Sequence, residues 1–447
     1  AGRGYRTLLI EKADFGRGSS SRSSKLIHGG VRYLRQGRIS LVREALRERS
    51  LLLRNAPHLV KPLPFVVPIY RSWEIPWYLS GLRLYQSLSG SQRLGEVEWL
   101  SPQQTVERLP ALRTDRLRGG VLYWDAEFDD ARMAIALFRT LEDAGGVALN
   151  AVELLAFAKR SGRITGAVLL DRLSGREFST SARIVINASG VFSDRLRALD
   201  EPQTQRKLAL SRGSHLVFPS FLPGKDALLL PKTSDGRVLF LIPWLGRLLL
   251  GTTEVPVEEP EESPQISPAE EALLRSEISR SLSLPSEALA SFSGLRPLLA
   301  EPGRKSRAEL SREHALFVSP SGLITLAGGK WTSYRRMGEE CIDFAERIHG
   351  LPHRPSKSET TPLHGAPAEK EDSPSVYGSE QKEIDRLGSS EPGASLPIHP
   401  ALPYTFAEIL WGIRKESALT LEDLLARRTR ALFLDARAAL EAAPRVA

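Results

Sequence analysis

Apolar residues in the first quarter of the chain recur with two different periods. Residues 6–10 form a short apolar run, which predicts a buried strand. Residues 40–56 carry apolar residues on one helical face before a proline, which predicts an amphipathic helix. Residues 60–124 are rich in Pro, Trp and Tyr and show neither period, so we expect an irregular, separate lobe there.

Helical and strand patterns alternate along the rest of the chain. Asp129 or Asp130 caps a predicted helix over residues 131–144, and three short strands with Ser-Gly turns follow it. A second irregular, β-rich block covers residues 208–299, and residues 321–350 return to a strand, a Gly-Gly turn and a helix. The last segment of the chain is helical by its period.

This alternation predicts an α/β fold, in which a discontinuous Rossmann-like domain is interrupted by a β-rich substrate domain and followed by a helical domain. The charged, Pro- and Ser-rich stretch before the helical tail is expected to be a partly mobile linker. The expected divisions are a cofactor-binding domain at 1–65, 125–207 and 300–350, a substrate domain at 66–124 and 208–299, a linker at 351–398 and a helical domain at 399–447.

Length and cysteine content narrow the class of protein. A chain of 447 residues holds two or three domains with a large core. No apolar segment approaches the roughly 20 residues that cross a bilayer, and Cys341 is the single cysteine. A disulfide framework, an iron–sulfur site and a Cys-rich metal site are therefore excluded, no metal is expected, and the reducing cytoplasm is the expected compartment.

The positive charge of the chain is concentrated near its start. The formal net charge is +8, and residues 1–60 carry 13 Lys and Arg against 4 Asp and Glu. An anionic membrane surface, a phosphorylated cofactor and substrate, and a solvated helix face with salt bridges each account for such a run. Nucleic acid is disfavoured because no helix-turn-helix, RNP or zinc pattern is present.

The apolar strand at residues 6–10 ends in an acid, Glu11. An acid at this point of a dinucleotide-binding fold holds a ribose, and the hydroxyl- and glycine-rich residues 19–34 suit a loop along an anionic cofactor. The glycine-rich turn that precedes such an acid by about 20 residues is not in the sequence. We therefore expect the native gene to encode about 20 further residues before Ala1, the C-terminus also to be cut, and the chain as given to bind its cofactor poorly.

Six motifs occur in the order and at the spacing of one known family. They are S-S-R-S-S-K-L-I-H-G-G-V-R-Y-L, D-D-A-R-M, I-N-A-S-G-V-F-S-D, R-G-S-H-L-V-F-P, F-S-G-L-R-P-L-L and L-A-G-G-K-W-T-S-Y-R-R-M. With these motifs the chain closely resembles the FAD-dependent glycerol-3-phosphate dehydrogenases. The tail from L-P-Y-T-F to L-D-A-R-A-A resembles that family's C-terminal helical domain, so the resemblance covers nearly the whole chain.

The resemblance implies FAD as the cofactor, in a fold of the glutathione-reductase type. A carboxylate at position 11 would accept the adenosine ribose hydroxyls. A Gly-Gly turn before a helix that starts near Thr332 would bring backbone N–H groups and a positive helix end to the flavin. The residues implied to bind the cofactor are Glu11, Ser20, Ser21, Ser24, Lys25, His28, Gly29, Gly30, Gly190, Gly328, Gly329 and Thr332.

A phosphate dianion calls for a cluster of cations. The candidate phosphate-binding cations are Arg296, Arg312, Arg32 and Lys330, and Tyr33 is expected to line the same substrate pocket. The resemblance also implies Arg32 and Lys330 as catalytic residues, together with His215. The alternative for each cation is an ordinary surface residue.

His215 is the expected proton acceptor. Neutral imidazole accepts a hydroxyl proton near pH 7, and the strand S-H-L-V-F would aim His215 at one face. The alternative is a buried histidine bonded to the backbone. Asp129, Asp130 and Arg132 are expected to form a helix cap and a structural ion pair instead of acting as catalysts.

The implied reaction is the oxidation of sn-glycerol 3-phosphate to dihydroxyacetone phosphate, with a hydride passing from C2 to the flavin. The resemblance also implies a membrane quinone as the acceptor, an enzyme of glycerol breakdown bound at the inner face of the cell membrane, and a homodimer. Three alternatives stay open: an oxygen-using glycerol-3-phosphate oxidase, an inactive FAD-deficient fragment or binding remnant, and an amino-acid-type oxidase, which the number of candidate phosphate-binding cations disfavours.

Overall fold

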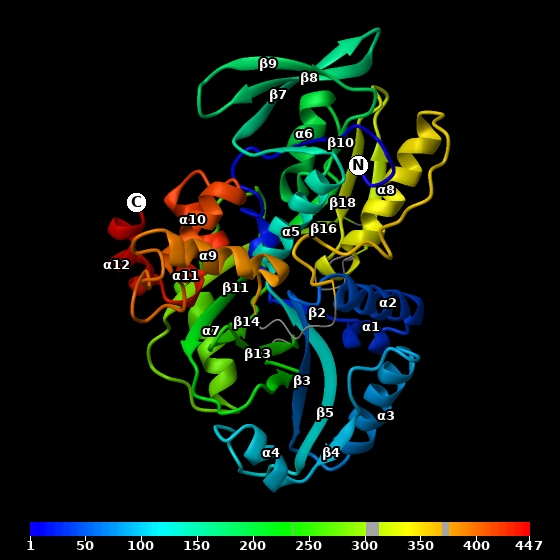
Figure 1. Cartoon of the computed structure of the whole chain (residues 1–447). Helices are drawn as coiled ribbons and strands as arrows, with labels where there is room; N and C mark the ends of the chain where they lie inside the picture. The colour runs from blue at the N-terminus through cyan, green and yellow to red at the C-terminus, as the bar shows by residue number, and fades with distance from the viewer. Residues whose placement is uncertain (235, 301–312, 369–374) are drawn as a thin grey trace.

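A computed structural model of the chain describes residues 1–234, 236–300, 313–368 and 375–447. Its strands form four sheets, one of ten strands and three small ones. The small sheets gather at one end of the molecule, the large sheet occupies the other, and the C-terminal helices lie along one side (Figure 1). The α/β class and the helical tail expected from the sequence are therefore confirmed.

The nucleotide-fold pieces pair across long sequence distances. β1 (Leu8–Ile10) runs parallel to β6 (Val147–Leu149), and β10 (Ile186–Asn187) runs parallel to β18 (Ile324–Gly328), which also pairs with β17 (His314–Val318). Parallel strands joined by helices are the expected α/β arrangement. The helices of this end are α5 (Asp130–Asp143), α6 (Ser193–Asp200) and α8 (Tyr334–Ile348).

The strand predicted at residues 6–10 is shorter and less buried than expected. Leu8 and Leu9 are 41% and 40% exposed. β1 pairs with β6 alone among the described strands, so much of its apolar surface faces solvent. The prediction of a buried strand is wrong because burial of a parallel strand depends on what covers both its faces and its edges, and local sequence does not report this.

The three strands with Ser-Gly turns are confirmed. β7 (Val152–Arg160), β8 (Arg163–Asp171) and β9 (Glu177–Ser181) form an antiparallel sheet. Ser161 and Gly162 both have positive φ angles, as a tight two-residue hairpin turn requires.

The ten-stranded sheet joins the two blocks that were expected to be irregular. β3 (Val60–Ile69) pairs antiparallel with β5 (Gly119–Phe128) along its ten residues and parallel with β12 (Ala227–Leu230). Residues 60–124 are therefore not irregular, and the expected domain boundary after residue 65 falls inside β3. Three prolines in β3 hid its strand pattern, since proline is unfavourable in central strands. The other strands of this sheet are β2 (Leu26–Ile27), β4 (Glu98–Leu100), β11 (Leu208–Pro219), β13 (Leu239–Trp244), β14 (Arg247–Gly251), β15 (Val255–Val257) and β16 (Ala290–Leu299).

Local sequence signals set where several helices begin. α4 (Pro102–Arg108) and α7 (Pro268–Ser279) each start at a Ser-Pro pair whose serine forms a capping box. α7 interrupts the block that was expected to be β-rich only. α2 (Ile39–Asn55) confirms the predicted amphipathic helix and buries Val42 and Leu46. One further helix of this part, α3 (Glu74–Ser87), lies to one side of the end of the molecule where α4 and β4 are found (Figure 1).

The C-terminal helices share a core with the large sheet. Leu424 and Phe433 belong to the same buried cluster as Val217 and Phe292. Within the expected linker, the Glu359 carbonyl accepts hydrogen bonds from side chains of α2, so that part of the stretch is packed. None of the described helices combines the length and apolarity that a membrane span requires. The C-terminal helical elements are α9 (Gln381–Ser390), α10 (Phe406–Lys415), a π-helical turn (Asp423–Arg428), α11 (Ala431–Leu434) and α12 (Ala436–Val446).

Candidate active site

The loop at residues 19–30 carries seven of the expected cofactor-binding residues. It begins with a 3-10 turn (Ser19–Ser21), is pinned to β5 by the short strand β2, and passes through left-handed backbone at Lys25 (φ 60°) and Gly30 (φ 78°). The loop lies on the large sheet, since the hydroxyl of Ser19 donates to the carbonyl of Leu295. The turn-forming composition of the loop therefore folds it back onto the strands of the substrate region.

His215 lies on β11 and is 2% exposed. Its Nε2 is 2.9 Å from Oγ of Ser24, and its ring stacks on Phe292 of β16 with 4.8 Å between the centroids. Its Nδ1 is buried without a hydrogen-bond partner among the described residues. Burial first, and then the charges of Lys25 and Arg296, lower the pKa of His215 well below its usual value. The imidazole is therefore neutral at pH 7 and has one nitrogen able to accept a proton.

Arg296 lies on the same face of the sheet as His215. β11 and β16 pair antiparallel, with Gly213 opposite Gly294, so the intervening positions have no side chains. The guanidinium of Arg296 lies over Gly213, where any Cβ would collide with it, and the backbone of Arg22 lies over Gly294. The guanidinium donates to Oγ1 of Thr252 at 2.9 Å and to the carbonyl of Thr253 at 3.2 Å. Because Gly213 and Gly294 lack side chains, the guanidinium of Arg296 and the backbone of Arg22 can pack against the sheet at these two positions.

Glu270 supports this region from the opposite face of β11. Its Oε1 accepts hydrogen bonds of 2.8 Å from the hydroxyls of both Ser214 and Thr253. Burial opposes ionisation, but hydrogen bonds from Ser267, Thr253 and Ser214 outweigh it and lower the pKa of Glu270 to about 2. The ionised carboxylate of Glu270 therefore fixes β11 next to His215, through Ser214, and also fixes Thr253, which Arg296 contacts.

The segment around Lys330, from the C-terminal half of the chain, contacts the loop at residues 19–30. Nζ of Lys330 lies 3.9 Å from the ring centroid of Tyr33, on helix α1 (Val31–Arg35). The hydroxyl of Thr332 bonds both the backbone N–H and the carbonyl of His28, at 3.3 and 3.4 Å. The indole N–H of Trp331 donates to the carbonyl of Ser20 at 2.9 Å. The two motif segments, about 300 residues apart, are therefore in direct contact.

Two expected residues fall outside what the structure describes. Arg312 belongs to an undescribed segment, and the side chain of Arg32 is likewise not described. Their expected contacts with the substrate phosphate stay predictions.

A buried network holds the glycine pair of the loop. The hydroxyl of Tyr85, on α3, accepts the backbone N–H of Gly29 at 2.7 Å and donates to Asp125 at 2.9 Å. Asp125 in turn pairs with Arg49 of α2 at 2.7 Å. None of the three network residues is predicted from the sequence, because nothing local marks a tyrosine 56 residues away as the partner of Gly29.

Lys25 does not extend toward open space. Its ammonium is fully buried, 2.6 Å from Asp130 and 2.9 Å from the carbonyl of Ser21. Burial lowers the pKa of Lys25 to about 7, with Asp130 acting in the opposite direction. A cation that already contacts a buried carboxylate gains little from a second anion, and the expectation that this side chain meets a cofactor phosphate stays a prediction.

The expected cap and ion pair at the start of α5 are confirmed in part. Asp129 accepts the backbone N–H groups of Ala131 and Arg132, and Arg132 pairs with Glu416 at 2.7 Å. Asp130 is not the cap, but its carboxylate forms a buried ion pair with Lys25. It bonds the loop through Lys25 and Ser23.

Three segments offer groups that suit a flavin dinucleotide. The half-buried Glu11 carboxylate accepts one hydrogen bond, from the Ala13 N–H, and retains further acceptor positions. Gly328 and Gly329, both with positive φ, precede a 3-10 turn (Trp331–Ser333) that leads directly into α8, so the helix begins close to Thr332, at Tyr334. Gly190, also with positive φ, opens the turn before α6, with no atom within 4 Å of a Cβ built there. An acid after a parallel strand and glycine turns at helix starts fit such a cofactor.

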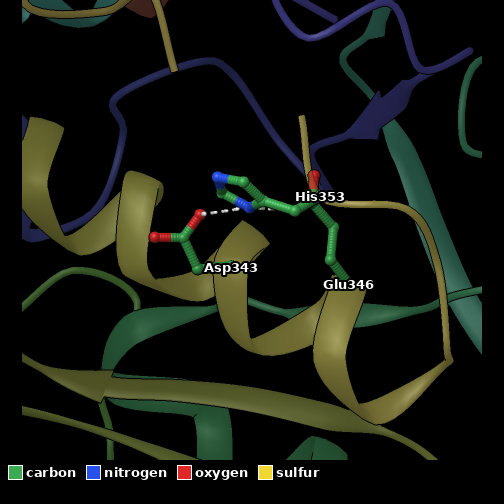
Figure 2. A group of neighbouring side chains, drawn as sticks. All are labelled: Asp343, Glu346 and His353. Carbon is green, nitrogen blue, oxygen red and sulfur yellow. Dashed lines mark hydrogen bonds and ion pairs between the residues drawn. The ribbon is translucent and has the colours of Figure 1, made fainter. Parts of the chain in front are cut away.

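A group of possible metal ligands lies on and after α8. Asp343, Glu346 and His353 face one another (Figure 2). Arg3 lies 2.6 Å from Asp343 and 3.2 Å from Glu346, and the hydroxyl of Tyr5 also bonds Glu346. A guanidinium already compensates these carboxylates, so we assign the group a structural role that ties the N-terminal segment to α8.

Both parts of the chain are similar to known protein families. Residues 1–335 match the FAD dependent oxidoreductase family, and residues 324–447 match the C-terminal domain of alpha-glycerophosphate oxidase. The chain is 38% identical to the mitochondrial glycerol-3-phosphate dehydrogenase of Macaca fascicularis over 99% of its own length, and spans 66% of the length of that relative. It is 35% identical to a probable mitochondrial glycerol-3-phosphate dehydrogenase of Dictyostelium discoideum, of which it covers 76%.

The structure is similar to that of the glycerol-3-phosphate dehydrogenase from Bacillus halodurans complexed with FAD. The TM-score is 0.78 at 27% sequence identity, and the match covers 99% of this chain and 85% of the other.

Proposed function

The chain belongs to the FAD-dependent glycerol-3-phosphate dehydrogenase family, and from that premise we propose that it uses FAD to oxidise sn-glycerol 3-phosphate to dihydroxyacetone phosphate. The observation that carries this proposal is the shared face of β11 and β16, where the neutral imidazole of His215 and the guanidinium of Arg296 both stand beside the loop at residues 19–30. An acceptor for a hydroxyl proton and a cation for a phosphate are the two groups that oxidation of this substrate needs.

The substrate phosphate is bound by cations. Arg296 is fixed by Thr252 and Thr253, which leaves its planar fork oriented before the substrate arrives. Lys330, held over the ring of Tyr33, supplies a second positive charge. We propose that Arg32 and Arg312 complete this phosphate site.

His215 takes the proton of the C2 hydroxyl. Burial keeps the imidazole neutral, and the contact of Nε2 with Ser24 and the stack on Phe292 fix the orientation of the ring. FAD, when bound, supplies the two-electron chemistry by accepting the hydride. Glu11, the loop at residues 19–30, and the turns at Gly190 and Gly328–Gly329 would hold it.

A membrane quinone is the proposed electron acceptor, and helix α3 supports contact with a membrane. Trp73, Trp77 and Leu84 are 62%, 60% and 47% exposed and lie on one helical face. Arg71 and Arg83 are exposed beside them. Tryptophan with arginine suits the boundary of an anionic lipid surface. We propose that this face rests on the inner surface of the cell membrane, where an enzyme of glycerol breakdown meets both substrate and quinone.

The experiment that tests the reaction is anaerobic flavin bleaching. The purified protein, supplied with FAD, is mixed with sn-glycerol 3-phosphate, and flavin absorbance is followed. We expect bleaching with glycerol 3-phosphate and none with glycerol or an amino acid. Failure to retain FAD would favour the inactive fragment, and bleaching by an amino acid would favour an amino-acid-type oxidase.

A separate experiment tests whether a quinone or oxygen is the electron acceptor. Bleached protein is mixed with a soluble quinone analogue without oxygen, or with oxygen alone while peroxide is measured. We expect fast reoxidation by the quinone and little peroxide. Stoichiometric peroxide would favour the oxygen-using oxidase, an alternative that the match to the alpha-glycerophosphate oxidase C-terminal domain keeps open.

A further inference from the structure

We propose that the C-terminal helical segment at residues 423–434 is a positioning element of the active site, with Arg430 and Phe433 holding the loop at residues 21–25 and Phe292, and through them the ring of His215. The inference rests on the proposed function only for the role of His215 as proton acceptor.

Arg430 reaches the loop through a buried carboxylate. Its Nη2 donates to the carbonyl of Ser21 at 2.9 Å and to Asp130 at 3.3 Å. The same carboxylate accepts the N–H of Ser23 at 2.9 Å, its hydroxyl at 2.7 Å, and the ammonium of Lys25 at 2.6 Å. Arg430, Lys25 and Asp130 are each 1% exposed or less. Asp130 thus connects the loop, through Ser23 and Lys25, to the C-terminal segment, through Arg430.

The charges of this cluster balance. Nε of Arg430 also lies 3.8 Å from Asp129, so two cations face two carboxylates. Buried ions persist only when they are paired, and removal of one partner leaves the others uncompensated. Arg430 is therefore needed for Lys25 and Asp130 to keep their arrangement, and Ser24 lies between the two loop residues that Asp130 binds.

A second path from the same segment runs through aromatic rings. The ring of Phe433 contacts that of Phe292 with 4.8 Å between centroids, and Phe292 stacks on His215 at the same separation, with 17° between the planes. The guanidinium carbon of Arg430 lies 4.3 Å from the centroid of Phe433. The side of the His215 ring that faces Phe292 is thus backed by C-terminal residues.

The irregular backbone of the segment explains how it makes both contacts. Arg427 and Arg428 end a π-helical turn, and both bond Asp14, in the loop after β1. Arg430 then adopts a left-handed conformation, with φ 83°. A regular α-helix would spread three such arginines around its axis, whereas this break lets all three be buried, with bonds to Asp14 and Ser21 in the segment between β1 and β2.

The test measures the state of His215 directly. His215 is assigned in the 15N-histidine spectrum of the protein with the help of His215→Asn, and its ring resonances are compared in Arg430→Gln, Arg430→Lys and Phe433→Leu. Arg437→Gln is the matched control, because Arg437 lies in the same region but its side chain is 77% exposed and, among the described residues, its ion pair is with the exposed Glu287. Circular dichroism checks folding of each variant.

We expect the His215 resonances to shift in Arg430→Gln and in Phe433→Leu, less in Arg430→Lys, and not in the control. The rate of flavin bleaching by sn-glycerol 3-phosphate should fall about tenfold to a hundredfold in Arg430→Gln, as displacement of a reacting group by a fraction of an ångström to an ångström predicts, while the apparent Kd of the substrate changes less than about threefold. Arg430→Lys should recover part of the rate.

Unchanged His215 resonances in the folded variants would overturn the proposal. If Arg430→Gln does not fold, Phe433→Leu decides, since it keeps an apolar side chain and removes only the ring. The spectrum does not depend on turnover, so a wild-type protein that fails to bleach would overturn the proposed function and leave this test intact.

Discussion

Nε2 of His215 lies 2.9 Å from the hydroxyl of Ser24, which is 191 residues earlier in the chain. Through this contact the loop that carries the expected cofactor residues touches β11, the strand that carries the proposed proton acceptor. Its other supports include the bond between Gly29 and Tyr85 and the pair between Lys25 and Asp130. The geometry of the reaction therefore depends on how that loop is fixed.

His215→Asn should lower the rate of flavin reduction by about 10²–10⁴-fold, because an amide cannot accept the hydroxyl proton. Burial lowers the pKa of His215 below its usual 6.5, so wild-type activity should fall as pH drops through that lowered pKa. The variant should lose this acid limb. Stopped-flow bleaching across pH measures both effects, with His399→Asn as a control. A variant that keeps the acid limb would remove His215 from the proton transfer.

Arg296→Ala should raise KM for sn-glycerol 3-phosphate with flavin content near normal. Loss of one charged partner of a bound phosphate costs about 2–5 kcal/mol. Gly213→Ala offers an independent check, since its methyl group would displace the guanidinium and should reproduce the rise in KM. Steady-state kinetics with both variants measure this. An unchanged KM in Arg296→Ala would make that residue structural.

Tyr85→Phe should lower the free energy of unfolding by about 1–3 kcal/mol, because the buried N–H of Gly29 loses its acceptor. FAD should also be released more easily, since the loop at residues 19–30 loses an anchor. Urea unfolding and flavin retention on gel filtration measure the two effects. The control is Tyr70→Phe, whose more exposed hydroxyl donates to the carbonyl of Arg113 at 3.4 Å. Equal stability of the two variants would argue against the network.

Glu270→Gln should destabilise the protein at pH 7 but not near pH 2. The pKa of Glu270 is lowered from 4.5 to about 2 because hydrogen bonds to its carboxylate outweigh the effect of burial. A carboxyl with a depressed folded-state pKa contributes stability above its unfolded pKa and loses it as pH falls through the folded value. The unfolding curves of wild type and variant should therefore converge between pH 4.5 and about 2. A constant difference across that window would contradict the assigned role.

The sequence by itself determined which residues are candidates for proton transfer and phosphate binding. It also determined, in part, which face of its strand a candidate occupies. Alternation along S-H-L-V-F placed His215 on one face of a strand, and the motif positions of Arg296, Lys330 and Thr332 led to segments that meet the loop at residues 19–30. These features are local, because strand period, helix capping and glycine turns depend on neighbours a few residues away.

Only the tertiary structure decided which charges and hydroxyls are partners. Lys25 and Arg430 both pair with Asp130, across separations of 105 and 300 residues, and Tyr85 holds Gly29 from helix α3. In a chain with 61 Lys and Arg, composition gives no reason to prefer one pairing over another. Burial selects the pairs, since an ion that loses water must find its partner within a few ångströms, and the packing of the C-terminal helices against the large sheet decides which ions lose water.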